Sequence, residues 1–417
     1  MTLTLTVHRG TQQIGGSCIE IEHEPSGERL ILDAGRPLDA PEGATGLLPE
    51  TLDRERPATV LISHPHQDHW GLINELPPGW PVRTGAKSAA LIEITGDYTR
   101  QKYGGTLKTW DSRSGPIALG AFTVTPYLTD HSALDAYMLL IEGGAGEASR
   151  RVLYTGDFRR HGRKSALVDS MMANPPANVH ALLMEGTNLR SDKPVISETE
   201  LEREFVDLFR RTGGRVFLSW SGQNIDRTVT IYRAARLTGR TLAIDLYVAD
   251  VLERIAEGTG LPRPGFPNLK VVITSRLASW LRKRGRGDFV SEMAPHGVSA
   301  DKLASGNWVV MLRRSLIGDF TRRGVTPRPE DAFVFSMWRG NLDEPYHAEA
   351  RDWCANAGAE IVQIHTSGHA APADLAAFAT AIDPRWLVPV HGVKWDDPGL
   401  DLPPVKRLGD GERWTVP

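Results

Sequence analysis

Three histidines and one aspartate lie within six residues, at His64, His66, Asp68 and His69. They directly follow the apolar run 58–62, which is typical of a buried strand. In extended backbone, side chains two residues apart point to the same side, so His64 and His66 can reach one ligand position. Neutral imidazoles and carboxylates are the ligands that Zn²⁺ and similar divalent ions take. This density of ligand-type side chains predicts a metal site rather than a polar loop.

Other histidines and carboxylates follow apolar runs elsewhere in the chain and are further candidate ligands. A site for two divalent ions needs roughly six to eight ligands, one of them a carboxylate that both ions share. We expect the first ion at His64, His66 and His131. We expect the second ion at Asp68, His69 and His391, with Asp157 between the two ions. A water between two such ions loses its proton near neutral pH and becomes a nucleophile.

Two carboxylates have further predicted roles around this centre. Asp68 could orient the water or carry its proton. Asp33 ends the run 29–32 and is followed by Ala34 and Gly35, so it could orient a ligand histidine from behind. The alternative for Asp33 is an aspartate that caps a turn.

The predicted secondary structure that must position these residues changes along the chain. Residues 1–197 read as strands of alternating or apolar pattern that repeatedly end in His, Asp or Glu, which suggests one site at a common edge. From residue 198 the pattern alternates between helices and strands, which predicts parallel βαβ units. We therefore expect a core domain at 1–197 and 346–417, interrupted by an inserted α/β domain at 198–345. The stretch 282–326 reads as loop-rich and basic.

Composition restricts the class of protein further. No apolar run approaches the length of a membrane-spanning helix, and the N-terminus lacks the layout of a signal peptide. The two cysteines, Cys18 and Cys354, exclude a disulfide framework, so we expect a cytoplasmic protein with two buried thiols and no membrane partner. The net charge is only −3, yet residues 276–328 hold eleven Lys and Arg against four Asp and Glu. This segment predicts either a phosphate-binding surface or a solvated helix face.

The pattern from His64 to His69, with Asp33, His131 and the Thr-Gly-Asp ending at Asp157, resembles the metallo-β-lactamase superfamily. Three more motifs resemble its β-CASP branch of nucleases: 184–188 around Glu185, 365–369, and 389–392 around His391. The resemblance spans nearly the whole chain and is greatest to ribonuclease J and its short prokaryotic relatives. It implies an αββα sandwich with a dinuclear metal site and an inserted β-CASP domain.

The resemblance also implies roles for single residues. His369 would contact the scissile phosphate, and Glu185 would orient that histidine. His365 and Ser367 would bind the substrate backbone. The turn that contains Ser221 and Asn224 is similar to a nucleotide-contacting turn of the family, although an ordinary βα turn is equally consistent with it.

These observations predict a ribonuclease that uses two divalent ions, with Zn²⁺ expected and Mn²⁺ as the alternative, and cuts internally, from the 5′ end, or both. One alternative is a DNA-directed nuclease of the same branch, with single-stranded DNA as the partner. Others are a hydrolase of small thioesters, esters or lactones on the same core, and a non-catalytic RNA-binding paralogue. The oligomeric state stays open, with a homodimer among the alternatives.

Overall fold

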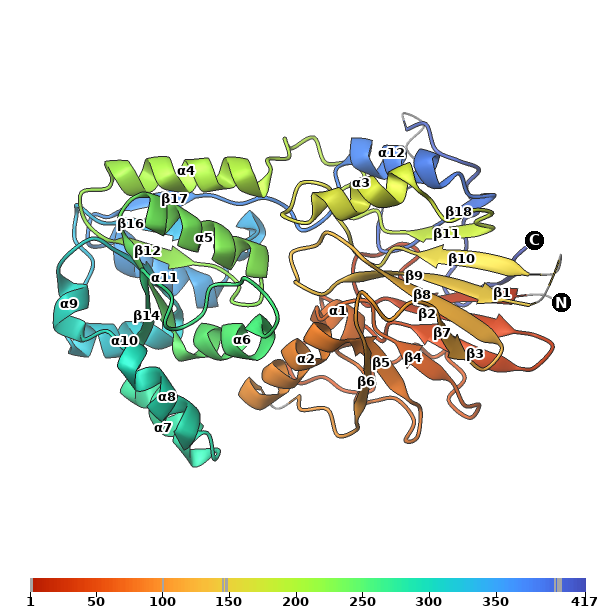
Figure 1. Cartoon of the computed structure of the whole chain (residues 1–417), viewed down its shortest axis with the longest axis horizontal. Coiled ribbons are helices and arrows are strands. Elements are labelled where there is room, and N and C mark those ends of the chain that lie inside the picture. The colour runs from red at the N-terminus through yellow and green to blue at the C-terminus, as the bar shows by residue number, and fades with distance from the viewer. Residues whose placement is uncertain (1–2, 100, 145, 147–148, 394, 396–399) are drawn as a thin grey trace. The chain divides into compact units, whose positions relative to one another are not determined.

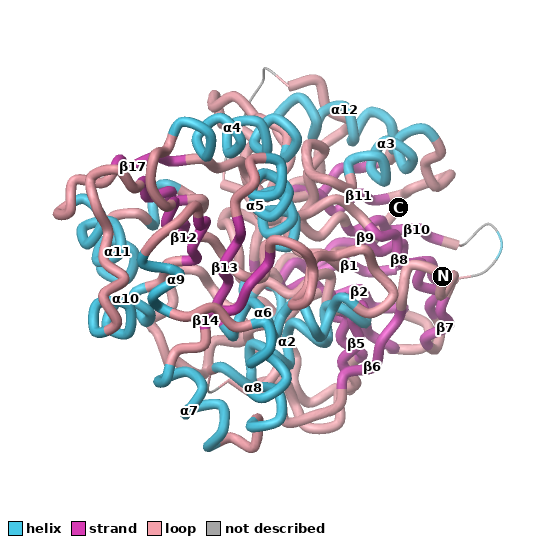
Figure 2. Tube along the Cα trace, turned by 60° about the vertical axis from the view of Figure 1, so that its left-hand side comes forward, coloured by secondary structure: helices cyan, strands magenta, loops and turns pink. Residues whose placement is uncertain are grey.

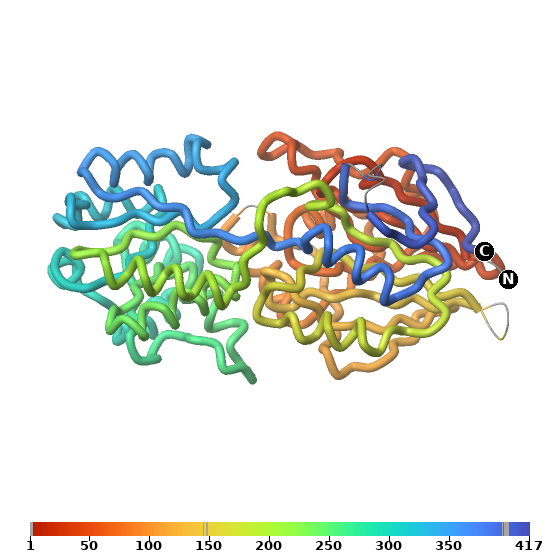
Figure 3. The backbone as a smooth tube through the Cα atoms, turned by 90° about the horizontal axis from the view of Figure 1, so that it is seen from above, coloured from red at the N-terminus to blue at the C-terminus, as the bar shows by residue number. Residues whose placement is uncertain are grey.

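Strands from both ends of the chain build the first of two units, which comprises Met1–Pro194 and Gly368–Pro417. The computed structural model describes residues 3–99, 101–144, 146, 149–393, 395 and 400–417. Figure 1 shows the two sheets of this unit, and Figure 3 shows its red N-terminal and blue C-terminal segments in the same part of the fold. The strand order is β19-β1-β2-β3-β4-β5-β6 in one sheet and β18-β11-β10-β9-β8-β7 in the other.

The first sheet consists of β1 (Leu3–Arg9), β2 (Cys18–His23), β3 (Glu28–Leu32), β4 (Thr59–Leu61), β5 (Val82–Gly85), β6 (Leu107–Trp110) and β19 (Arg413–Thr415). The second consists of β7 (Ile117–Leu119), β8 (Phe122–Leu128), β9 (Tyr137–Gly143), β10 (Arg150–Tyr154), β11 (Ala181–Met184) and β18 (Trp386–Pro389). The helices of this unit are α1 (Gln67–Trp70), α2 (Ala86–Tyr98), α3 (Ser165–Ala173) and α12 (Pro372–Ile382).

The two sheets face each other across one apolar core. Alternate side chains such as Leu5 and Val7 of β1 share this core with Leu139 and Ile141 of β9. The other face of the second sheet is covered by α3 and α12, and Ile92 of α2 packs with the outer face of the first sheet. The layers are therefore helix, sheet, sheet, helix, which confirms the predicted αββα sandwich.

The C-terminal part of the chain completes both sheets. β18 pairs in parallel with β11, and β19 pairs antiparallel with β1. Residues that follow β11 and β18, including Glu185 and His391, therefore leave the second sheet at the same edge. This pairing is how a histidine so distant in sequence joins the residues near the N-terminus.

The second unit, Val195–Ser367, is built around one parallel sheet of order β14-β13-β15-β12-β16-β17. Its strands are β12 (Val216–Ser219), β13 (Thr241–Asp245), β14 (Leu269–Val272), β15 (Trp308–Met311), β16 (Ala332–Phe335) and β17 (Glu360–Gln363). Its α-helices are α4 (Glu198–Arg211), α5 (Ile225–Leu237), α6 (Leu246–Ala256), α7 (Ser275–Lys283), α8 (Gly287–Met293), α9 (Ala300–Ala304), α10 (Arg314–Arg322) and α11 (Pro345–Ala355). Two 3₁₀ turns are η2 (Ala294–His296) and η3 (Arg339–Asn341). Figure 2 shows the cyan helices around the magenta strands of this sheet.

Local sequence signals explain the start of this unit. Ser197 caps α4 and forms a capping box with Glu200, in which each side chain satisfies the other residue's backbone N–H. The strands β12 and β16 are short and fully buried apolar runs, as is usual for the middle of a parallel sheet covered on both faces.

Two expectations about this region need correction. The second domain boundary was expected after residue 345, but α11 and β17 belong to the second unit, which ends at Ser367. The reason is that β17 pairs in parallel with β16, whereas its polar ending made it look like a strand of the core. The stretch 282–326 was expected to be rich in loops, but it contains α8, α9, β15 and α10. Its short helices form because Phe289, Met293 and Phe320 are buried and anchor them.

Among the described residues, none of the helices is both long enough and apolar enough to cross a membrane.

Candidate metal centre

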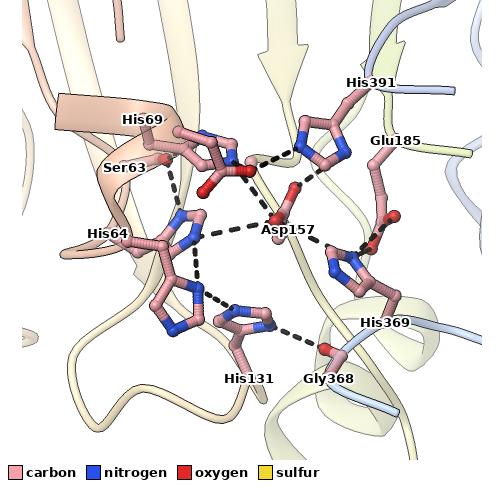
Figure 4. Close-up of polar contacts among 12 residues, drawn as sticks. Ser63, His64, His69, His131, Asp157, Glu185, Gly368, His369 and His391 are labelled. Carbon is pink, nitrogen blue, oxygen red and sulfur yellow. Dashed lines mark hydrogen bonds and ion pairs between the residues drawn. The ribbon is translucent and has the colours of Figure 1, made fainter. Parts of the chain in front are cut away.

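One edge of the sandwich gathers histidines and carboxylates from five strand ends (Figure 4). The loop after β4 carries His64 and His66, and the short helix α1 carries Asp68 and His69. The segments after β8 and β10 carry His131 and Asp157. The segments after β11 and β18 carry Glu185 and His391. The residues that the sequence singled out as ligands thus lie together in space.

Three imidazoles form the first group of this centre. His64 Nε2 lies 3.1 Å from His66 Nδ1, and His131 Nε2 lies 3.0 Å from the same nitrogen. Burial, followed by the nearby imidazole of His69, holds the pKa of His64 well below its usual range, and burial acts in the same way on His131. Burial also lowers the pKa of His66. The neutral form favoured in all three is the form that binds a metal ion.

Two carboxylates and two imidazoles form the second group, which consists of Asp68, His69, Asp157 and His391. Asp68 Oδ2 lies 3.2 Å from His391 Nε2, and Asp157 Oδ2 lies 3.2 Å from His69 Nε2. The same Asp157 oxygen lies 3.7 Å from His64 Nε2 in the first group. Asp157 therefore stands between the two groups, at the place where a shared ligand is needed.

The chemistry of these donors fits divalent metal ions. Within each group, one ligand atom per residue lies within 4.8 Å of all the others. Among the described residues, His69 Nε2 and Asp157 Oδ1 are buried side-chain atoms that make no hydrogen bond. Burial alone would raise the pKa of Asp68, but His69 and His391 hold it at about 2. Burial would lower the pKa of His69, but Asp157 and Asp68 raise it well above its usual range, so this pocket attracts positive charge.

Asp33 holds His69 from behind. Its Oδ2 atom lies 2.6 Å from His69 Nδ1, which leaves Nε2 of the imidazole to face the centre. The same oxygen accepts hydrogen bonds from the Ser63 hydroxyl at 2.8 Å and the Tyr154 hydroxyl at 2.7 Å. The Ser63 amide donates to Asp33 Oδ1 at 2.7 Å. Such a partner fixes the tautomer and orientation of a metal-binding histidine.

The backbone around the centre is held in unusual conformations. Asp33 has φ 62° and His391 has φ 48°, in the left-handed region that non-glycine residues rarely occupy. A Cβ atom at Gly35 would lie only 1.8 Å from the carbonyl oxygen of Asp68. Only glycine therefore fits at residue 35, next to the helix α1 that carries Asp68.

A carboxylate–imidazole pair adjoins the second group. His369 Nδ1 lies 3.1 Å and 3.2 Å from the two carboxylate oxygens of Glu185, and 3.7 Å from Asp157 Oδ2. Glu185 is fully buried and accepts hydrogen bonds from the amides of Phe158 and Thr187. Burial would lower the pKa of His369, but Glu185 and Asp157 outweigh it and raise this pKa to about 9.

Several residues that support the centre were missed by sequence reasoning. Ser63 and Tyr154 hold Asp33, and the Thr187 hydroxyl lies 2.9 Å from His391 Nδ1. Each one lies beside or within a motif that was recognised, and Thr187 belongs to the motif 184–188. Ser63 precedes His64, and Tyr154 precedes the Thr-Gly-Asp at Asp157. A polar residue at the end of an otherwise apolar strand was the available signal.

The other predicted site residues lie in the second unit. Ser221 lines a cavity of about 250 Å³ together with Tyr247 and Arg313. The Asn224 side chain accepts a hydrogen bond from the Arg227 amide and so caps α5, which is a structural role in its own right. His365 and Ser367 follow β17. Substrate contacts by these four residues stay predictions.

Comparison with known proteins agrees with this geometry. Residues 12–183 match the metallo-beta-lactamase superfamily, and residues 357–394 match the Zn-dependent metallo-hydrolase RNA specificity domain. Ribonuclease J of Helicobacter pylori strain B128 is 24% identical, over 94% of this chain and 56% of the relative. Ribonuclease J of Mycobacterium tuberculosis strain H37Rv is 26% identical, over 94% of this chain and 69% of the relative. A crystal structure of a protein of unknown function from Enterococcus faecalis V583 has a TM-score of 0.79 at 19% identity and covers all of both chains.

The αββα fold, the cluster of ligand-type side chains and the match over residues 12–183 together identify a domain of the metallo-β-lactamase type in this chain. Within that superfamily, its motifs and its matches are similar to the β-CASP nucleases of the ribonuclease J type. The chain spans 56% of the length of the Helicobacter pylori relatives.

Proposed function

We propose that this protein is a metal-dependent ribonuclease that hydrolyses phosphodiester bonds of RNA at the centre described above. The observation that carries the proposal is the position of Asp157 between two groups of ligand-type side chains, with His369 beside it. A hydrolase needs a nucleophile and a means of stabilising the charge that develops on phosphate, and this arrangement has residues for both.

The first ion would be held by His64, His66 and His131, and the second by Asp68, His69 and His391, with Asp157 shared. When bound, two divalent ions would supply Lewis-acid stabilisation of the phosphate and an activated water. The number of imidazoles favours Zn²⁺, and the carboxylates also suit Mn²⁺.

The chain's own residues complete the chemistry. Asp68 is anionic beside the centre and can orient the attacking water or receive its proton. His369, held by Glu185, can donate a hydrogen bond to a nonbridging oxygen of the scissile phosphate or a proton to the leaving oxygen. The hydrogen bond between His69 Nδ1 and Asp33 Oδ2 fixes the orientation of the His69 ring during the reaction.

Two further observations support RNA as the substrate. The match to an RNA specificity domain covers 357–394, which includes His365, Ser367, His369 and His391. Relatives that carry the name ribonuclease J align over 94% of this chain. A hydrolase of small esters would have no use for the Glu185–His369 pair or for the basic segment of the second unit.

The test uses end-labelled RNA and single-stranded DNA of the same sequence, each incubated with protein loaded with Zn²⁺ or Mn²⁺. We expect cleavage of RNA, and none by the variant Asp68→Ala with His69→Ala. The product lengths show whether the enzyme cuts internally or from the 5′ end. Preferential cleavage of DNA, or equal cleavage of RNA by the double variant, would overturn the proposal.

A further inference from the structure

The structure divides the cations of the basic segment 276–328 into two kinds. Five of the eleven have a carboxylate partner: Arg286 with Asp250, Arg313 with Asp245, Arg314 with Glu349, Arg322 with Asp319, and Arg328 with Glu330. The charge of these five is offset locally. They account for the solvated, ion-paired face that such a segment usually forms.

Four of the other six cations lie on one short element. Arg276, Arg282 and Lys283 belong to α7, and Arg284 is its C-cap. All four are exposed, and none forms an ion pair with a carboxylate in the part of the chain that the structure describes. The unneutralised charge of the whole segment is thus concentrated at α7.

Helix stability alone does not explain this concentration. Cations in the last turn of a helix are favoured by its dipole, which accounts for Arg282 and Lys283. Arg276 lies in the first turn, where the dipole disfavours a cation, and no acidic residue occupies that turn. Four adjacent cations also repel one another, so their grouping calls for an anionic partner.

The packing of α7 leaves this charge available. The helix buries only Ala278 and Leu281, and it lies against α8, which buries Phe289 and Val290. Figure 1 shows α7 and α8 as a helical pair at one end of the second unit, away from its helices α4 and α5. On the same pair, the Arg284 guanidinium lies 3.9 Å from the centroid of the partly exposed Trp280 ring.

We infer that the helical pair α7–α8 is an RNA-binding arm, which holds the phosphate backbone of a single strand outside the metal centre. Guanidinium groups match phosphate oxygens in a bidentate manner, and an aromatic ring among cations offers a surface on which a base can stack. Because the protein as a whole carries net charge −3, the attraction is local to this arm. The inference rests on the proposed function, since it takes the substrate to be RNA.

The experiment neutralises the arm with Arg282→Gln, Lys283→Gln and Arg284→Gln in one variant. A matched control removes three exposed cations from α4 and α5, with Arg203→Gln, Arg210→Gln and Arg236→Gln. Binding of a long single-stranded RNA is measured over a range of salt concentrations in an Asp68→Ala background, so that the RNA stays intact. Hydrolysis of a short oligonucleotide is measured in the native background.

We expect the arm variant to lose about tenfold in affinity and its salt slope to fall by about 2, since each lost phosphate contact removes about 0.7 from the slope. The control variant and the hydrolysis of the short oligonucleotide should be unaffected. An unchanged affinity and slope in the arm variant, or an equal loss in the control, would overturn the inference. If the native protein binds RNA through the arm but never cuts it, the proposed function fails while the arm stands.

Discussion

At the scale of single residues, this centre depends on carboxylates that hold imidazoles in place. Asp33 holds His69, and Glu185 holds His369, each at hydrogen-bond distance and each fully buried. Neither carboxylate needs to touch the substrate to influence the reaction. Each carboxylate fixes the orientation of its partner imidazole ring and the nitrogen that carries the proton.

We predict that Glu185→Gln lowers kcat for RNA hydrolysis about a hundredfold, because His369 loses the carboxylate that orients it and favours its charged form. Glutamine preserves the volume, and its one carbonyl oxygen can still accept from one of the Phe158 and Thr187 amides, which donate to different oxygens of Glu185. The measurement is steady-state kinetics together with the metal content of the variant. A full kcat in a variant with normal metal content would exclude this role for Glu185.

Tyr154→Phe tests the support of Asp33. The substitution removes the hydrogen bond from the phenol to Asp33 Oδ2, so His69 should be less well oriented. We predict a metal affinity about tenfold lower, measured by competition with a coloured chelator. Tyr137→Phe is the matched control, because its phenol donates to Asp135, which lies in neither group of predicted ligands. Equal losses in both variants would mean that the effect is only structural.

Residue-scale prediction from the sequence relied on polar side chains that end apolar runs. His131, Asp157 and His391 were found in this way, and the structure brings them together with the His64 loop. Tyr154 and Ser63 were missed because their function lies in hydrogen bonds between β3, β4 and β10, and sequence spacing carries no information on such pairs. The left-handed backbone at His391 was likewise missed, since histidine favours this conformation only weakly.

At the scale of elements, a buried ionic cluster joins the first three strands. His8 of β1 lies 3.3 Å from Glu20 of β2, and Arg29 of β3 donates to the same Glu20 oxygen at 2.5 Å. Burial alone would raise the pKa of Glu20, but the hydrogen bonds from His8 and Arg29 hold it at about 2. Asp33 directly follows β3, so the stability of these strands affects the position of Asp33 in the metal centre.

The depressed pKa of Glu20 gives a prediction for acid stability. Because the folded pKa lies below the unfolded value of about 4.5, this group stabilises the fold above pH 4.5 and loses that contribution as the pH falls toward 2. We predict that Glu20→Gln lowers the stability of β1 to β3 by roughly 2 kcal/mol at neutral pH and by much less near pH 2. Hydrogen exchange of the amides in β2 measures this locally. A loss of protection that is the same at both pH values would contradict the assignment.

At the scale of the whole molecule, the domain organisation was predictable because two kinds of pattern follow one another along the chain, whereas the family resemblance was carried by the motifs. Strands that end in ligands indicated the sandwich, and alternating helices and strands indicated the parallel sheet of the second unit. The end of the second unit was misplaced because β17 is followed by polar residues, as the strands of the first unit are. Only its pairing with β16 shows where it belongs.

The central claim is that two metal ions, with Asp157 as their shared ligand, catalyse RNA hydrolysis. Its most direct test is a titration of metal-free protein with Zn²⁺ or Mn²⁺ while the initial rate of RNA cleavage is followed. We predict no cleavage without added ions, a rate that reaches its plateau at two ions per chain, and no recovery in Asp157→Asn. Cleavage at full rate in the presence of excess chelator, or a plateau unaffected by Asp157→Asn, would contradict the account.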